Sequence, residues 1–233
     1  MIKGTTRFEY CKNILQQNPI FRNLEESTLD SLLSGVKFKK WKKGAEFHHH
    51  ETLNNFHVIL SGRLKIYQIN PENGRELTVF LLSRHDVFDI ISLLDEQKRT
   101  TNFKTLDTVE LLSAPVDNVK SWIESNPEIN KTLLPYLGKR MRMLEENLTD
   151  AVLSDIPTRL AKLILKNIDE SSKKLQLIND LSNNEIASLI GSTRAVVNRH
   201  IQNFKEDGIL DVQRKNTQIK NIKKLLEKIE DSL

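Results

Sequence analysis

Residues 181–210 (LSNNEIASLIGSTRAVVNRHIQNFKEDGIL) constrain the fold most, because they predict two short helices separated by a glycine turn. Ser182 and Glu185 have the spacing of a capping box, in which each side chain satisfies a backbone N–H group at a helix start. Apolar residues then recur at helical spacing. Gly191 stands where the first helix must end, a position that glycine fills without steric cost. This order predicts a helix-turn-helix.

The second predicted helix has one apolar face and one polar face. Val197, Ile201 and Phe204 share the side suited to packing. The opposite side suits the major groove of DNA, where arginine chelates guanine, asparagine reads adenine and alanine contacts a thymine methyl group. A threonine at the helix start donates to phosphate. We therefore predict a double-stranded DNA site made of Thr193, Arg194, Ala195, Asn198 and Arg199. The alternative is an ordinary helical hairpin with a solvated basic face.

Composition limits the class of protein. The chain has 233 residues, which is enough for two small domains with separate cores. It holds no run of about 18 apolar residues, so we expect no membrane span. The N-terminus has no apolar signal core, and one cysteine, Cys11, forms neither an internal disulfide nor a four-cysteine metal site. We expect a cytoplasmic protein, and the formal charge of +4 favours a polyanionic partner.

The region before the helix-turn-helix is rich in short strands. After a helical lead-in at about 7–33, alternation and turn signals such as Asn73-Gly74 predict strands at 36–41, 45–50, 56–60, 64–69, 76–82 and 109–114. Many short strands at this spacing indicate an antiparallel barrel or jelly roll. We therefore predict an α+β fold with a jelly-roll sensor domain at residues 1–128.

A long helix is predicted to follow, after a shorter one at 116–124. Its apolar positions step by four, four, three and four, which is heptad-like spacing: Leu133, Leu137, Met141, Leu144 and Leu148. Such a stripe pairs with an identical helix, so we predict a homodimer with residues 129–154 as the dimerisation helix. The alternative is a helix that packs on its own domain.

Residues 155–233 complete the predicted DNA-binding domain. Pro157 suits the first turn of a helix that runs to about Asp169, and residues 175–178 suggest a short strand. Residues 209–212 and 218–222 flank Arg214 and Lys215 as a small hairpin, or wing, whose basic tip binds phosphate. A short amphipathic helix at 223–233 closes the chain.

A strand-rich sensor, a long pairing helix and a winged helix-turn-helix in this order resemble the cyclic-AMP receptor protein/FNR family of bacterial regulators. The resemblance rests on LSGRLKIY with NPENGRELTV and on NNEIASLIGSTRAVVNR. The GSTRxxVxR form and VFDIISL look like the cyanobacterial nitrogen-control branch. The resemblance implies a homodimer on a palindromic operator, contact with RNA polymerase and a small-molecule effector in the jelly roll.

The expected effector pocket departs from the cyclic-AMP branch. Asp89-Ile90 stand where that branch has a ribose-binding glycine-glutamate pair, and Arg99-Thr100 stand for its arginine-serine pair. Arg140 and Glu145 fall where the nitrogen-control branch has a matching pair. The candidate pocket residues are Phe88, Asp89, Ile90, Ile91, Arg99, Thr100, Arg140 and Glu145. We expect an effector other than cyclic AMP. A constitutive DNA-binding protein with no effector is the alternative.

The histidines of the sensor suggest a second hypothesis for its ligand. Some members of the family bind haem and sense nitric oxide or carbon monoxide, which makes His48, His50, His57 and His85 candidate axial ligands. The other interpretation is a polar turn with solvated imidazoles. We predict no dedicated metal site. No catalytic motif is evident, so we expect a protein that is not an enzyme.

Overall fold

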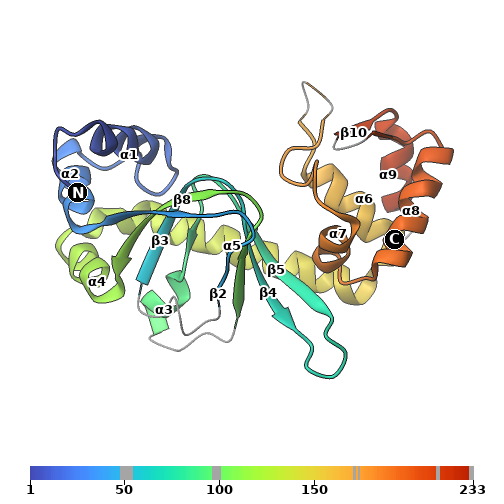
Figure 1. The fold of residues 1–233 in the computed structure, drawn as a ribbon, viewed down its shortest axis with the longest axis horizontal. Coiled ribbons are helices and arrows are strands. Elements are labelled where there is room, and N and C mark those ends of the chain that lie inside the picture. The colour runs from blue at the N-terminus through green and yellow to red at the C-terminus, as the bar shows by residue number, and fades with distance from the viewer. Residues whose placement is uncertain (48–54, 96–100, 170–171, 173, 214–215, 231–233) are drawn as a thin grey trace. The chain divides into compact units, whose positions relative to one another are not determined.

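A computed structural model (Figure 1) describes residues 1–47, 55–95, 101–169, 172, 174–213 and 216–230. The chain divides into two compact units. The first is made of Met1–Gln68 and Phe80–Arg142, and the second of Ile69–Val79 and Met143–Leu233. Two short helices lead into antiparallel sheets, a long helix follows, and helices with a small hairpin end the chain, which confirms the predicted α+β class. In these ranges, no helix has the length and apolar character needed to cross a membrane.

Two four-stranded sheets form the β-structure that we predicted as a jelly roll. Their strand orders are β1-β8-β3-β6 and β2-β7-β4-β5. The strands are β1 (Lys37–Trp41), β2 (Glu46–Phe47), β3 (Asn55–Ser61), β4 (Leu64–Ile69), β5 (Glu76–Leu82), β6 (Val87–Phe88), β7 (Asn102–Thr105) and β8 (Val109–Pro115). We did not predict β6 and β7, because two and four residues are too few to show a period of two.

Strand β3 is buried on both faces, which explains its almost continuous apolar sequence. Phe56, Val58 and Leu60 belong to a core cluster shared with the helices of the first unit. Ile59 faces the other way, into a cluster between the two sheets that includes Leu111 from β8 and Phe103 from β7. The sensor therefore has a helix-covered outer core and an aromatic-rich inner core.

The helices of the first unit cover one sheet. They are α1 (Thr6–Gln17), α2 (Glu26–Gly35), α3 (Ile90–Asp95), α4 (Val116–Ser125) and the start of α5 (Asn130–Leu153), which follows a 3₁₀ turn at Pro127–Ile129. The helical lead-in that the sequence predicts at about 7–33 is made of two helices, α1 and α2. Buried Asn18 ends α1, since its Oδ1 accepts from Ile20 N at 2.8 Å and its Nδ2 donates to His85 O at 3.0 Å.

The second unit contains a winged helix-turn-helix. Its elements after α5 are α6 (Ile156–Lys166), α7 (Asn183–Leu189), α8 (Arg194–Glu206), β9 (Leu210–Gln213), β10 (Asn216–Ile219) and α9 (Ile222–Glu230). Helix α9 packs on the core of the domain, because Leu225 is fully buried and Thr158 Oγ1 donates to Lys228 O at 3.1 Å.

Two sequence predictions for this unit are wrong. Residues 175–178 do not form a strand: Leu175 makes only an isolated bridge with Ile168, and turns follow it. Leu175 and Ile178 are both buried three residues apart, which suits a turn rather than strand alternation. The second wing strand is 216–219 rather than 218–222. Buried Ile219 pairs with Leu210, whereas Ile222 is 45% exposed and begins α9.

Candidate nucleic-acid interface

Helix α7 begins at the predicted capping box. Glu185 N donates to Ser182 Oγ at 3.3 Å, and Ser182 N donates to Glu185 Oε2 at 2.9 Å. These two bonds satisfy backbone donors that a helix start otherwise leaves unpaired. The start of α7 is therefore fixed by residues that are three positions apart in the sequence.

The turn between the two helices depends on Gly191, which adopts a φ of 63°. In that left-handed conformation a side chain is unfavourable, so glycine is the natural residue. Ser192 N donates back to Ala187 O at 2.8 Å, and Arg159 from α6 donates to Ile190 O at 2.9 Å. Thr193 then caps α8, since its Oγ1 accepts from Val196 N at 3.4 Å.

Helix α8 has the two faces that its sequence predicts. Val197, Ile201 and Phe204 are buried, which fixes the rotation of the helix on its domain. Arg194, Ala195, Arg199 and Gln202 are exposed on the remaining surface. Within the described part of the chain, neither the Arg194 nor the Arg199 guanidinium makes a hydrogen bond or an ion pair. Both groups are available to an external acceptor.

The end of α8 leads directly into the wing. Gly208 has a φ of 70°, and Ile209 N donates to Phe204 O at 2.8 Å, which is the Schellman pattern of a helix end. Strand β9 starts at Leu210 and pairs with β10. Leu210 lies opposite Ile219 at one end of the pair, and Gln213 lies opposite Asn216 at the other. The predicted phosphate contacts Arg214 and Lys215 lie outside the described residues.

Two contacts around these helices were not predicted from the sequence. Asn183 Nδ2, at the first residue of α7, donates to Asn198 Oδ1 on α8. The Oγ atoms of Thr78 and Ser188 lie 2.7 Å apart in a buried hydrogen bond, and residues 69–79 belong to the same compact unit as α7. The partners in these two contacts are separated by 15 and by 110 positions in the sequence, so no local sequence pattern predicts them.

Comparison with known proteins assigns the family. A model of the Crp-like helix-turn-helix domain matches residues 158–228, and a model of the cyclic nucleotide-binding domain matches residues 38–126. The CRP-like cAMP-activated global transcriptional regulator of Mycobacterium tuberculosis is 30% identical over 217 residues, which are 91% of this chain and 96% of that protein. The chain belongs to the Crp/Fnr family of transcription regulators.

Other members of the Crp/Fnr family are similar at lower coverage or identity. The global nitrogen regulator of Nostoc sp. is 30% identical over 165 residues, 68% of this chain and 74% of that protein. The fold matches the c-di-GMP responsive global regulator CLP of Xanthomonas campestris with a TM-score of 0.72 at 16% identity, over 84% of this chain and all of that one. A CooA mutant from Carboxydothermus hydrogenoformans matches with a TM-score of 0.70 at 22% identity, over 88% of this chain and 92% of that chain.

The segment that corresponds to the ribose-binding pair of the Crp branch is buried here. Asp89 has a φ of 62°, a backbone conformation that glycine adopts most easily. Ile90 is 6% exposed and packs in the outer core with Val87 and Leu93. Ile91 is 42% exposed. Ile90 therefore offers neither charge nor hydrogen bond to a ligand.

Arg140 is engaged within the sensor. Its guanidinium pairs with Asp86, its Nε donates to the Tyr136 hydroxyl at 3.0 Å, and it lies 5.8 Å from the centre of the Phe80 ring. Burial raises the pKa of Asp86, and the Arg140 charge opposes that shift. Glu145 is exposed in the second unit. Phe88, another pocket candidate, is buried in the inner core of the sensor. The candidates Arg99 and Thr100 lie outside the described residues.

The His57 side chain lies in the inner aromatic core and is 1% exposed. Its ring stacks on Phe88 at 4.4 Å between centroids and meets the Trp41 ring edgewise at 5.6 Å. Burial, with a smaller effect of the Lys39 charge, lowers its pKa to about 3. Neither ring nitrogen has a hydrogen-bond partner in the ranges that the structure describes. The interpretation as a solvated imidazole is therefore wrong for His57.

These contacts do not fit a haem ligand. Both ring nitrogens of His57 are buried within the packed inner core, so neither is accessible to a haem iron in this arrangement. His85 is half-buried with a φ of 75°, and burial lowers its pKa. His48 and His50 lie outside the described residues. Among the described residues no group of three or more His, Cys, Asp or Glu is arranged to hold a metal ion.

Proposed function

We propose that the protein is a homodimeric transcription regulator that recognises a palindromic DNA operator through α8 and responds to an effector other than cyclic AMP. Residues 1–128 act as sensor, 129–154 as dimerisation helix and 155–233 as DNA-binding domain. The observation that carries the proposal is a pair of exposed guanidinium groups, Arg194 and Arg199, that make no hydrogen bond or ion pair with any residue the structure describes. They lie on a helix whose other side is buried in a core.

The chemistry of the exposed residues suggests how α8 reads DNA. Arg194 and Arg199 chelate the O6 and N7 atoms of guanines, and Ala195 contacts a thymine methyl group. The Asn198 oxygen is held by Asn183, which leaves its amide N–H groups to donate to a base acceptor or to phosphate. Thr193 and the wing residues Arg214 and Lys215 position the phosphate backbone.

The wing prediction has a specific test. Replacing Lys215 by alanine should weaken binding to every duplex by a similar factor, because a phosphate contact carries no base information. The slope of log K against log salt concentration should flatten by about one. Fluorescence anisotropy titrations at several salt concentrations measure both effects. Lys223→Ala, an exposed lysine outside the wing, is the matched control. A change in base preference in Lys215→Ala would contradict the phosphate role.

Exposure along α5 supports the dimer. Leu133 at its start is 4% exposed and packs in the sensor core. Further along, large apolar side chains are partly or mostly exposed to solvent in the described part of the chain: Met141 is 64% exposed, Leu144 36% and Leu148 67%. Water-exposed apolar residues at heptad-like spacing are stabilised by an identical helix. A two-fold axis through such a pair also matches a palindromic operator.

The dimer prediction concerns Leu148. Leu148→Glu should weaken self-association at least about tenfold, because it removes an apolar contact and places two carboxylates opposite each other. Sedimentation equilibrium measures the dissociation constant. Glu146→Leu, on an exposed position two residues away, is the control that should leave the dimer intact. A Leu148→Glu protein that remains as tightly dimeric as the parent would contradict the assignment of this helix.

Burial of Ile90 supports an effector other than cyclic AMP. The Mycobacterium tuberculosis relative is named as cAMP-activated. In this chain a ribose hydroxyl beside Ile90 would lose its hydrogen bond to water and gain none from the Ile90 side chain. Isothermal titration calorimetry of the full dimer with cyclic AMP should give no saturable heat up to about 1 mM. Saturable binding in the micromolar range would overturn this part of the proposal.

A further inference from the structure

The tip of the β4–β5 hairpin belongs to the unit that contains the helix-turn-helix. Residues Ile69–Val79 group with Met143–Leu233, although β4 and β5 are neighbours in a sheet of the sensor. Three hairpin residues, Arg75, Leu77 and Thr78, meet α7 near its end and the turn that follows it. A segment of the sensor sequence is therefore in direct contact with the turn that leads into α8.

The hairpin tip is fixed by its own hydrogen bonds. Asn70 N donates to Arg75 O at 2.9 Å, and Gly74 N donates to Asn70 O at 2.9 Å. The side chains of Asn70 and Asn73 each accept a backbone N–H group within the turn, at 2.8 Å and 3.0 Å. Gly74 has a φ of 69°, which glycine adopts without strain. The hairpin therefore presents Arg75 and the residues after it from an ordered turn.

A buried hydrogen bond connects the hairpin to α7. The Oγ atoms of Thr78 and Ser188 lie 2.7 Å apart, and the two residues are 7% and 5% exposed. Ser188 Oγ also donates to Glu185 O at 2.9 Å. Because the Ser188 hydroxyl has one proton, Thr78 is the donor in the bond between the two hydroxyl groups. A buried group that loses its partner does not regain one from water, so this bond restrains Ser188.

Two arginines hold the turn that follows α7. Arg159 Nη1 donates to Ile190 O at 2.9 Å, and the Arg75 guanidinium donates to Gly191 O. A helix leaves its last carbonyl groups unpaired, and a cation is favourable at that end. A methyl carbon of Leu77 lies 3.8 Å from the position that a Cβ atom would take at Gly191. The hairpin therefore restrains the turn through a polar and an apolar contact.

These restraints act close to the start of the recognition helix. Helix α7 has seven residues, which is too short for a helix that is stable without tertiary contacts. Gly191 comes shortly before Thr193, which caps α8, and Arg194, which begins it. A displaced turn therefore displaces the residues that the proposed function places on DNA. A binding element that is already ordered binds more tightly, because less motion is lost on association.

We propose that the tip of the β4–β5 hairpin positions the helix-turn-helix for DNA recognition, with Thr78 and Arg75 as the positioning residues. Thr78 restrains the end of α7 through Ser188, and Arg75 restrains Gly191. Neither Thr78 nor Arg75 is assigned a contact with DNA. The effect on DNA binding rests on the proposed function, whereas the restraint on the turn does not.

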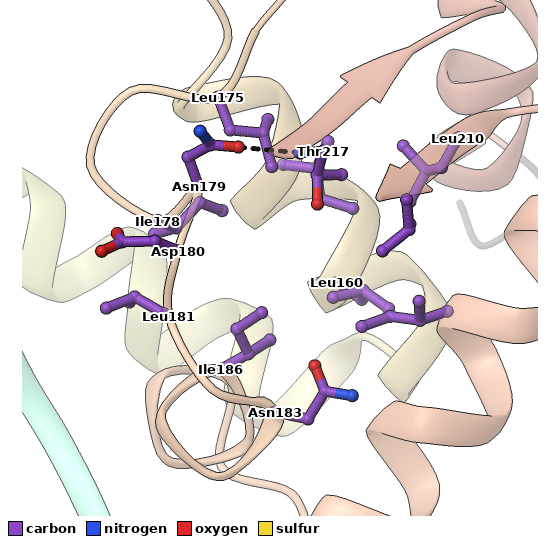
Figure 2. Close-up of a pocket in the computed structure, with 13 residues that line it drawn as sticks. Leu160, Leu175, Ile178, Asn179, Asp180, Leu181, Asn183, Ile186, Leu210 and Thr217 are labelled. Carbon is purple, nitrogen blue, oxygen red and sulfur yellow. Dashed lines mark hydrogen bonds between the residues drawn. The ribbon is translucent and has the colours of Figure 1, made fainter. Parts of the chain in front are cut away.

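The first test measures the restraint without DNA. Amide hydrogen exchange is compared in the full-length parent and in Thr78→Val, which keeps a branched side chain and removes the hydroxyl group. The Ser192 amide, which donates to Ala187 O, should exchange about threefold faster or more. Figure 2 shows a contact that involves no hairpin residue, in which Thr217 N donates to Asn179 Oδ1 at 2.8 Å. Exchange at Thr217 should not change. Equal exchange at Ser192 in both proteins would refute the restraint.

The second test measures affinity for a duplex that the parent selects from random DNA. Thr78→Val should weaken binding about threefold or more. Ser188→Ala should weaken it at least as much, because it leaves the Thr78 hydroxyl buried without its partner. The double variant should bind about as well as Thr78→Val, since one bond is lost only once. Thr6→Val, at an exposed threonine of α1, is the matched control that should bind as the parent does. Losses that multiply in the double variant would contradict a role through this bond.

Arg75 needs a measurement that separates positioning from direct contact with phosphate. Arg75→Ala should weaken binding about threefold without changing the slope of log K against log salt concentration. Loss of a phosphate contact would instead flatten that slope by about one. Arg75→Lys should restore affinity, because an ammonium group also donates to the Gly191 carbonyl. A flattened slope in Arg75→Ala would show direct DNA contact and overturn the positioning role of this residue.

The outcomes distinguish this proposal from the proposed function. Faster exchange at Ser192 together with parental affinity in Thr78→Val and Arg75→Ala would overturn the positioning role and leave DNA recognition by α8 standing. A parent protein that selects no common duplex would contradict the proposed function, and the exchange measurement would still decide whether the hairpin restrains the turn.

Discussion

Replacing Arg199 by alanine should cost about 1–3 kcal/mol for each half-site, the worth of a bidentate arginine–guanine contact. A symmetric dimer presents two such contacts, so operator binding should weaken by about 2–6 kcal/mol if the half-sites add. The guanidinium is exposed on α8 and unengaged in the described part of the chain, so its removal leaves no buried partner behind. Preference for one base pair in each half-site should relax.

Matched variants separate base reading from charge. Arg199→Lys keeps the positive charge and loses the planar fork, so it should retain binding to random duplex while losing the base preference. Arg22→Ala removes an exposed arginine of the sensor and should leave DNA binding unchanged. Anisotropy titrations on the operator and on single-base variants report each effect. Unaltered affinity and base preference in Arg199→Ala would mean that α8 does not read this base.

Acid should destabilise the sensor through His57. Its pKa falls from 6.5 in the unfolded chain to about 3 in the folded one, mainly because the ring is buried. Between these values the unfolded state binds one more proton, so stability decreases as the pH falls, by about 1.4 kcal/mol per unit. From pH 7 to pH 4.5 this residue alone should remove about 2–3 kcal/mol from the free energy of unfolding.

His57→Phe should abolish that share of the acid dependence. Phenylalanine keeps a planar ring against Phe88 and removes two buried nitrogens that have no partner among the described residues, so stability at pH 7 should not fall. Both tryptophans, Trp41 and Trp122, lie in the first unit, so urea titrations followed by tryptophan fluorescence report that unit. Parallel pH profiles for parent and variant would contradict this prediction, because they would mean that His57 has the same pKa in the folded and unfolded states.

Local chemistry made much of the DNA-binding domain predictable. The capping box at Ser182 and Glu185, the left-handed Gly191 and the buried face of α8 all follow from spacings of a few residues. The roles of Arg194 and Arg199 remain predictions. The sequence did not indicate the bond from Asn183 to Asn198, because it depends on how two helices meet in three dimensions.

In the wing and in the sensor, tertiary packing determines features that the local sequence pattern does not predict. The second wing strand begins two residues earlier than its apolar pattern suggested, since Ile219 rather than Ile222 enters the core. His57 sits on a strand whose alternation was visible, but its burial depends on Trp41 and Phe88 from two other strands. Such burial is set by pairings between distant segments, which no local window contains.

We expect that paired α8 helices read a symmetric DNA sequence. Selection of bound sites from a pool of random duplexes by the full-length protein tests it most directly. We expect enrichment of a palindrome with guanine-containing half-sites whose centres lie about one helical turn apart. The same selection with Arg199→Ala should lose one conserved position in each half-site. Recovery of duplexes with no common motif, or of a single unpaired half-site, would contradict recognition of a palindrome by paired α8 helices.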